Sequence, residues 1–97
     1  MIWKQARYTA ERDELAAVVA TVERFVAAVR ENEPRTFYRA WQRQDDELAF
    51  VHVMGFPDDA AEQAHRRAAY TLEFVDALYP RCREEPTFVD LRPLGEP

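Results

Sequence analysis

The chain opens with a stretch in which apolar and polar residues alternate and then changes to a helical pattern. Residues 2 to 9, IWKQARYT, alternate with the two-residue period of a strand. From residue 15 the apolar residues recur at the three- and four-residue spacing of an amphipathic helix: Leu15, Val18, Val19, Val22, Phe25, Val26 and Val29. Acidic residues precede this run, and Pro34 follows Asn32, so we expect the helix to end there.

The rest of the chain predicts a hairpin, a second helix and a last short strand. The expected elements are a strand over 35–44, a turn over 45–47, a strand over 48–56, a helix from Asp58 or Asp59 to Tyr79, and a strand over 87–91. The order β-α-β-β-α-β is that of the ferredoxin-like split βαβ unit. We therefore predict an α+β fold, a four-stranded antiparallel sheet with both helices on one face, and one domain over residues 1–97.

Both faces of the predicted hairpin are apolar. In residues 48–56, Ala49, Val51 and Val53 fall on one face, and Phe50, Met54 and Phe56 on the other. Two helices cover only one face of the sheet, so the other face needs a second sheet. We predict a homodimer formed through this face, with the two sheets enclosing a barrel-like cavity.

Composition narrows the class of protein. The 97 residues carry a net charge of −5, which disfavours nucleic acid and anionic membranes as partners. The single cysteine cannot form an internal disulfide, and no signal-peptide pattern or long apolar run is present. Metal-binding and phosphate-binding motifs are absent as well. We expect a cytoplasmic protein without a metal or cofactor.

The most specific part of the sequence is FVHVMGFPDDAAEQAHRRAAYTLEF, residues 50–74. An aromatic residue, an acidic turn, two alanines, a histidine and two further aromatics follow one another at these positions: Phe56, Asp58, Asp59, Ala60, Ala61, His65, Tyr70 and Phe74. With the element order, this pattern resembles the antibiotic biosynthesis monooxygenase family of dimeric α/β-barrel proteins. The chain departs from many members at Met54, where they carry a glutamate. The haem-degrading branch is disfavoured, because strand 1 lacks its asparagine and Val75 stands at the position of its axial histidine.

The resemblance implies a cavity between sheet and helices in each subunit. Family members include oxygenases that oxidise electron-rich aromatic molecules without metal or flavin, isomerases, and proteins that bind small molecules. The leading hypothesis is therefore a cofactor-independent monooxygenase acting on a small aromatic molecule. The alternatives are a non-catalytic ligand-binding or accessory dimer, and an isomerase or cyclase that uses the same pocket.

The two histidines are the candidate bases for such chemistry. His65 lies at the edge of an apolar arc of the second helix that includes Ala68 and Leu72, so it points obliquely towards the sheet. Such a histidine is either a half-buried side chain satisfied by a backbone carbonyl or a carboxylate, or a pocket base. His52 lies in mid-strand among apolar neighbours, and burial there would lower its pKa and keep it neutral.

Arg39 and Tyr70 are the candidates for stabilising the anion that develops on the substrate. Arg39 lies between aromatic residues in mid-strand, and must be paired, stacked or facing a ligand anion. Tyr70, Phe74 and Ala77 form a second apolar strip of the helix. We assign it to a subunit interface, although a role as a cover over the pocket stays open. Five further residues are predicted to line the substrate pocket: Trp3, Trp41, Phe50, Met54 and Phe56.

Overall fold

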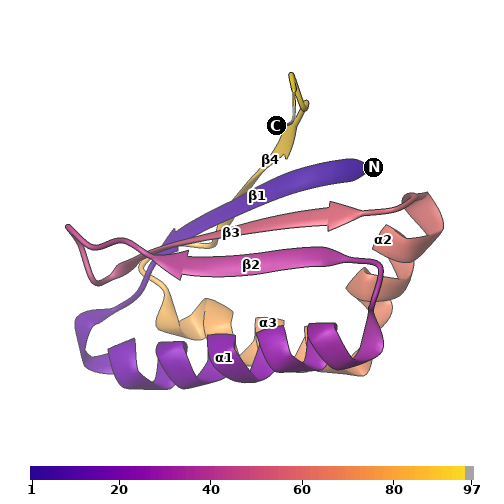
Figure 1. Cartoon of the computed structure of the whole chain (residues 1–97). Helices are drawn as coiled ribbons and strands as arrows, with labels where there is room; N and C mark the ends of the chain where they lie inside the picture. Colours follow the sequence, from indigo (N-terminus) through magenta and orange to yellow (C-terminus); the bar gives the residue numbers. More distant parts are fainter. Residues whose placement is uncertain (96–97) are drawn as a thin grey trace.

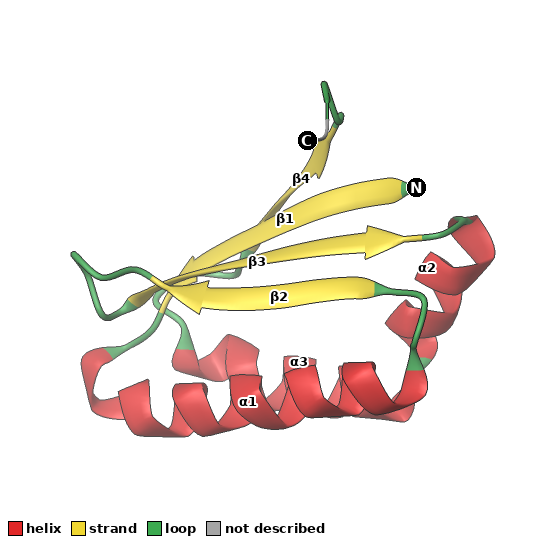
Figure 2. Ribbon diagram, in the orientation of Figure 1, coloured by secondary structure: helices red, strands yellow, loops and turns green. Residues whose placement is uncertain are grey.

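The computed structural model describes residues 1–95 and shows an antiparallel sheet with helices packed on one face (Figures 1 and 2). The elements are β1 (Ile2–Thr9), a 3₁₀ turn (Arg12–Glu14), α1 (Leu15–Asn32), β2 (Phe37–Gln42), β3 (Ala49–Phe56), α2 (Asp59–Arg67), α3 (Ala69–Leu78), a second 3₁₀ turn (Tyr79–Arg81) and β4 (Thr87–Leu91). The strand order β2-β3-β1-β4 is that of the ferredoxin-like fold, so the predicted fold class is confirmed.

Strand alternation divides the sheet into two different faces. The even-numbered residues of β1 and β3 point towards the helices, and Ala6, Tyr8, Phe50 and Met54 are buried there. The core continues onto α1 and α3 through Val18, Val22 and Leu78. This confirms the predicted division of β3 into two apolar faces.

The odd-numbered residues form the open face, which no helix covers. Phe37, Trp41, Val89 and Leu91 expose 37–48% of their surface there. Trp3 also lies on this face, with its ring over Gly55 on the neighbouring strand and its edge against Phe37 at 5.3 Å between ring centroids. The open face of this single chain is therefore broadly apolar.

The second predicted helix is broken in two at Ala68. Its backbone is extended there (φ −63°, ψ 142°), so α2 ends at Arg67 and α3 begins at Ala69. Asp58, one of the two residues predicted to cap this helix, accepts a hydrogen bond from the Ala61 amide at 2.8 Å. Beyond the break the arc expected for one continuous helix holds in part: Val75 and Tyr79 line the interior, whereas Leu72 does not.

Leu72 shows the effect of the break most clearly. It belongs to the expected apolar arc but is 54% exposed, whereas Phe74 turns inward and stacks on Phe25 of α1 at 4.0 Å between ring centroids. Tyr70 and Phe74, which the sequence assigned to a subunit interface, both contact side chains of their own chain. Among residues 1–95, no helix combines the length and apolar character that a membrane crossing requires.

Candidate functional site

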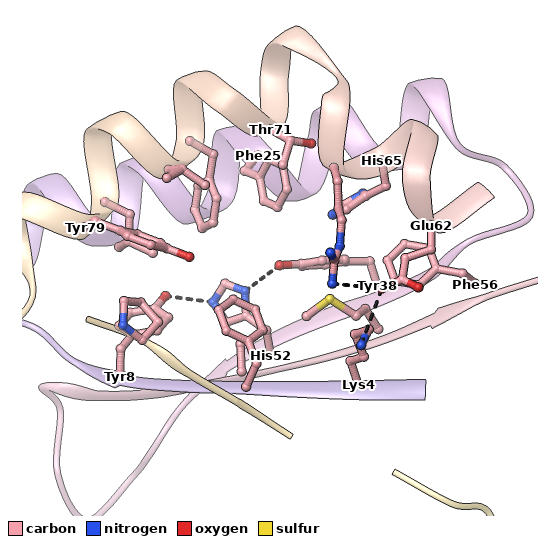
Figure 3. Close-up of a pocket in the computed structure, with 18 residues that line it drawn as sticks. Lys4, Tyr8, Phe25, Tyr38, His52, Phe56, Glu62, His65, Thr71 and Tyr79 are labelled. Carbon is pink, nitrogen blue, oxygen red and sulfur yellow. Dashed lines mark hydrogen bonds and ion pairs between the residues drawn. The ribbon is translucent and has the colours of Figure 1, made fainter. Parts of the chain in front are cut away.

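A cavity of about 290 Å³ lies between the sheet and the helices of a single chain. Its floor consists of helix-facing side chains of β1, β2 and β3, and α2 and α3 supply most of its roof (Figure 3). The lining is largely apolar and aromatic, with Phe25, Met54, Phe56 and Phe74 among its walls. The cavity lies between the sheet and the helices of one chain, where the family resemblance implies it.

His65 lies in this cavity with one ring nitrogen held by a carboxylate. Its Nδ1 is 2.7 Å from Oε2 of Glu33, and the side chain is 8% exposed. The ring is surrounded by Phe25, Tyr38 and Phe56, with ring centroids 5.0–5.9 Å away. Because Nδ1–H donates to the carboxylate, the neutral imidazole carries its lone pair on Nε2.

Glu33 makes hydrogen bonds to three helices beside His65. It caps the C-terminal end of α1, where its amide donates to the Val29 carbonyl at 2.7 Å. Its Oε2 accepts hydrogen bonds from His65 of α2 and from the hydroxyl of Tyr70 of α3. Burial, followed by the neighbouring Glu33, raises the pKa of Tyr70, so the phenol stays protonated and donates. The carboxylate therefore fixes the orientation of His65 across the break between α2 and α3.

His52 lies between two tyrosine hydroxyls. Its Nε2 is 2.7 Å from the hydroxyl of Tyr8 and its Nδ1 is 2.7 Å from that of Tyr38 (Figure 3). The directly opposite residues, Ala6 on β1 and Ala40 on β2, are small and leave room for the ring. Tyr8 and Tyr38 reach it diagonally from the two neighbouring strands.

Burial lowers the pKa of His52 from 6.5 to about 4, so the imidazole is neutral at physiological pH. A neutral imidazole has one donor and one acceptor nitrogen. One tyrosine must therefore donate to His52 while the other accepts from it. The accepting tyrosine keeps its own hydroxyl hydrogen available for a further partner. Burial also raises the pKa values of Tyr8 and Tyr38, so both hydroxyls remain protonated.

Besides the two histidines and their partners, the cavity has a charged group at one end. Glu62 of α2 is 6% exposed, and its carboxylate lies 3.4 Å from Nζ of Lys4 and 3.3 Å from the guanidinium of Arg66. Lys4 also contacts Asp90 at 2.6 Å, and this hydrogen bond raises the pKa of Lys4. The side chain of Arg66 is 59% exposed, and the nearby wall residue Phe88 is 54% exposed. This charged end is therefore where the cavity meets solvent.

The structure brings four of the predicted site residues together and separates the others. His52, His65, Met54 and Phe56 all line the cavity. Phe50 points the same way but is buried in the core, stacked on Tyr8 at 5.3 Å between centroids, and does not line it.

Trp3, Trp41 and Arg39 lie on the open face, because odd-numbered positions of β1 and β2 point away from the helices. Arg39 does not share a space with either histidine, and its guanidinium lies 5.4 Å from the ring centroid of Phe37. This is the stacked alternative considered from the sequence. Tyr70 does not line the cavity, and its hydroxyl is occupied by Glu33.

Four residues that matter to the site were not predicted: Tyr8, Tyr38, Glu33 and Glu62. Tyr8, Tyr38 and His52 all lie at even-numbered strand positions, which face the helices. The alternation of side chains along the strands could therefore have placed all three on one face. Glu33 gives no such signal, because it lies 32 residues from His65 and just beyond a helix end. Among residues 1–95, no group of histidine, cysteine or acidic side chains has a metal-binding arrangement.

These features define a class: an α+β protein of ferredoxin-like fold, with an aromatic cavity between its sheet and helices and two histidines in that cavity. A comparison with solved structures gives close matches over nearly the whole chain. A protein described as an antibiotic biosynthesis monooxygenase superposes with a TM-score of 0.88 at 22% identity, covering 98% of this chain and 100% of its own.

Rv0793 from Mycobacterium tuberculosis matches with a TM-score of 0.87 at 19% identity, over 98% of this chain and 96% of its own. PA3566 from Pseudomonas aeruginosa matches with a TM-score of 0.82 at 23% identity, over 97% of this chain and 94% of its own. No protein-family model matches the sequence, and no curated protein does either. The chain thus has the fold of the antibiotic biosynthesis monooxygenases, which confirms the resemblance seen in the sequence at the level of the fold.

Proposed function

We propose that this protein is a monooxygenase that needs no cofactor and oxidises a small hydroxyaromatic molecule in the cavity between sheet and helices. The observation that carries the proposal is the Glu33–His65 pair. A buried carboxylate holds Nδ1 of His65, so Nε2 is the basic nitrogen of a side chain that lines an aromatic cavity. A carboxylate that orients an imidazole in this way is a common arrangement for a general base.

The volume of the cavity limits the size of the substrate. An apolar cavity of about 150 Å³ accommodates one benzene ring. The space of about 290 Å³ therefore suits a molecule of one or two rings. The rings of Phe25, Phe56 and Phe74 provide flat surfaces for such a molecule.

In the proposed reaction, Nε2 of His65 removes the phenolic proton of the substrate. The electron-rich ring carbon of the phenolate then reduces O₂ and forms a C–O bond to it, giving a peroxide that is protonated to a hydroperoxide. The O–O bond breaks as the proton on that carbon leaves, so that a carbonyl and one water molecule result. The substrate is the reductant, O₂ is the oxidant, one oxygen atom enters the product and the other leaves as water.

The tyrosine–histidine–tyrosine chain supplies donors for the developing anion. Whichever of Tyr8 and Tyr38 accepts from His52 can donate its own hydroxyl hydrogen to a substrate oxygen. In this proposal Tyr70 is a positioning residue, because its hydroxyl is bound to Glu33 and does not face the cavity.

Oxygen uptake with a panel of one- and two-ring phenols and hydroquinones tests the proposal. The wild type should consume O₂ with at least one of them, and His65→Gln should lower the rate about 100-fold, as expected for loss of a general base. Arg67→Gln, an exposed change next to the cavity wall, should leave the rate unchanged. Turnover without oxygen uptake would indicate an isomerase, and uptake that is insensitive to His65→Gln would overturn the assigned base.

We infer that a second copy of the chain covers the open face. The apolar side chains on this face come from all four strands, and they include Trp3, Phe37, Trp41, Val51 and Val89. An extended apolar surface of this kind is typical of a subunit interface, and the sheet of a second copy would cover it. In the dimer, the two cavities with their histidines would lie on the outer sides of the paired sheets.

A further inference from the structure

We propose that the charged end of the cavity recognises a carboxylate, so that the ligand is an aromatic acid that carries a hydroxyl group on its far side. This inference rests on the proposed function for the orientation of the ligand, and it adds the chemical class of the substrate. It is based on the arrangement of Lys4, Arg66, Glu62 and Asp90.

Two cations meet one buried anion at this end of the cavity. Lys4 and Arg66 both contact the carboxylate of Glu62, whose side chain is only 8% exposed. Glu62 is therefore a fixed part of the wall that holds the two cations near each other. One anionic charge satisfies only one of the two cations, so the group has room for a second anion.

Asp90 provides that second anion in the unliganded protein. Its carboxylate lies 2.6 Å from Nζ of Lys4, but its side chain is 82% exposed and lies on β4, where every residue is exposed. Water has free access to the Asp90 side of this ion pair, so solvent compensates for much of the loss when Asp90 leaves Lys4. A ligand carboxylate can therefore take the place of Asp90 on Lys4 without a large cost.

Arg66 has the geometry to bind a carboxylate of the ligand. One guanidinium nitrogen contacts Glu62, and its other N–H groups have no partner among residues 1–95. A guanidinium binds a carboxylate through two parallel hydrogen bonds, while the Lys4 ammonium adds a single charge. The protein as a whole has a net charge of −5 and repels anions, so this local pair of cations would be needed to attract one.

The remainder of the cavity determines the rest of the ligand. Phe25, Phe56 and Phe74 are among the apolar lining residues. Tyr8, Tyr38 and His52 form the polar group on the floor (Figure 3). A ring anchored by its carboxylate at the charged end would place a ring hydroxyl near the tyrosines and His65. The expected ligand is a one- or two-ring hydroxyaromatic carboxylate.

Calorimetric titration of the whole protein with a matched pair of ligands tests this inference without any turnover. The pair is a hydroxynaphthoic acid and its neutral hydroxynaphthamide, which differ only in the charge at the anchoring group. The wild type should bind the acid about tenfold more tightly than the amide. Arg66→Gln should remove most of this preference, whereas Arg67→Gln removes the same charge one residue away, outside the cavity, and should preserve it.

Asp90→Asn provides a second test, in which the affinity for the acid should rise instead of fall. Removing the internal competitor should tighten binding of the acid several-fold and leave the amide unchanged. Equal affinity for acid and amide in the wild type, or no binding of either, would overturn the inference. So would a preference that survives Arg66→Gln. None of these results bears on oxygen uptake with neutral phenols, so the proposed function would stand or fall separately.

Discussion

Oε2 of Glu33 and Nδ1 of His65 lie 2.7 Å apart, although 32 positions separate the two residues in the sequence. The pair joins the C-terminal end of α1 to α2, and the hydroxyl of Tyr70 extends it to α3. It is therefore a structural connection between three helices and the feature that determines which nitrogen of His65 is basic.

Glu33→Gln should separate these two roles. The amide still fills the space but does not stabilise a protonated imidazole, so we expect the rate of oxygen uptake to fall about 100-fold while ligand affinity changes little. Nitrogen NMR of the His65 ring should show the Nδ1–H tautomer in the wild type and a mixture in the variant. Glu31→Gln, an exposed change on the same helix, is the control and should alter neither measurement.

His52 should make the stability of the protein depend on pH. Its folded-state pKa is lowered by burial from 6.5 to about 4, so between these values the unfolded chain binds the proton more readily than the folded one. The contribution is complete above about pH 6.5 and is lost as the pH falls towards 4. We expect wild type to lose about 2 kcal/mol of unfolding free energy from this group between pH 7 and pH 5.

The measurement is urea unfolding at both pH values for wild type and His52→Gln. Other acidic groups contribute similarly to both proteins, so the difference between them isolates His52. An identical loss of stability in the two proteins would show that His52 is not held neutral by its surroundings.

Gly55→Ala should disturb Trp3 on the open face. A Cβ at position 55 would lie 2.5–2.8 Å from three ring atoms of Trp3, and this is too close for both groups to stay in place. We expect a loss of about 1–3 kcal/mol in unfolding free energy and a shift in tryptophan fluorescence. Gly95→Ala is the matched control, because nothing lies within 4 Å of a Cβ built there, and it should change neither quantity.

A charge on the open face should separate the proposed dimer. Trp41→Glu places a carboxylate on the surface that we assign to the second copy, and burial of an unpaired charge is costly. Sedimentation should then show the mass of one chain for the variant and of two chains for the wild type. Leu72→Glu introduces the same charge at a residue that is 54% exposed on α3, and it should leave the mass unchanged. A wild type that sediments as one chain would contradict the dimer directly.

Several features of the fold could be predicted from local pattern alone. The end of α1 before Pro34 and the strand over Thr87–Leu91 appear as predicted, and the strands β2 and β3 lie within their expected ranges. These follow from periodicity and from the limits that proline sets on the backbone, which act over a few residues. The placement of His52 on the helix-facing side also follows from alternation.

The site was predicted less completely, for two physical reasons. Arg39 and Trp41 were assigned to the pocket by residue type, but strand alternation places them on the opposite face from His52. The break at Ala68 carries no proline or glycine to mark it, so Tyr70 and Phe74 were placed as though one helix continued. In the structure, Tyr70 is bound to Glu33 and Phe74 is stacked on Phe25, and these contacts accompany the change of direction.

The sequence by itself determined the order of the elements, the two faces of each strand and the class of fold, because these depend on the spacing of neighbouring residues. Only the tertiary structure decided which groups share a cavity. The Glu33–His65 pair and the binding of His52 between Tyr8 and Tyr38 join segments distant in the sequence. Such contacts depend on how strands align and helices pack, and the local pattern of the chain does not specify that alignment.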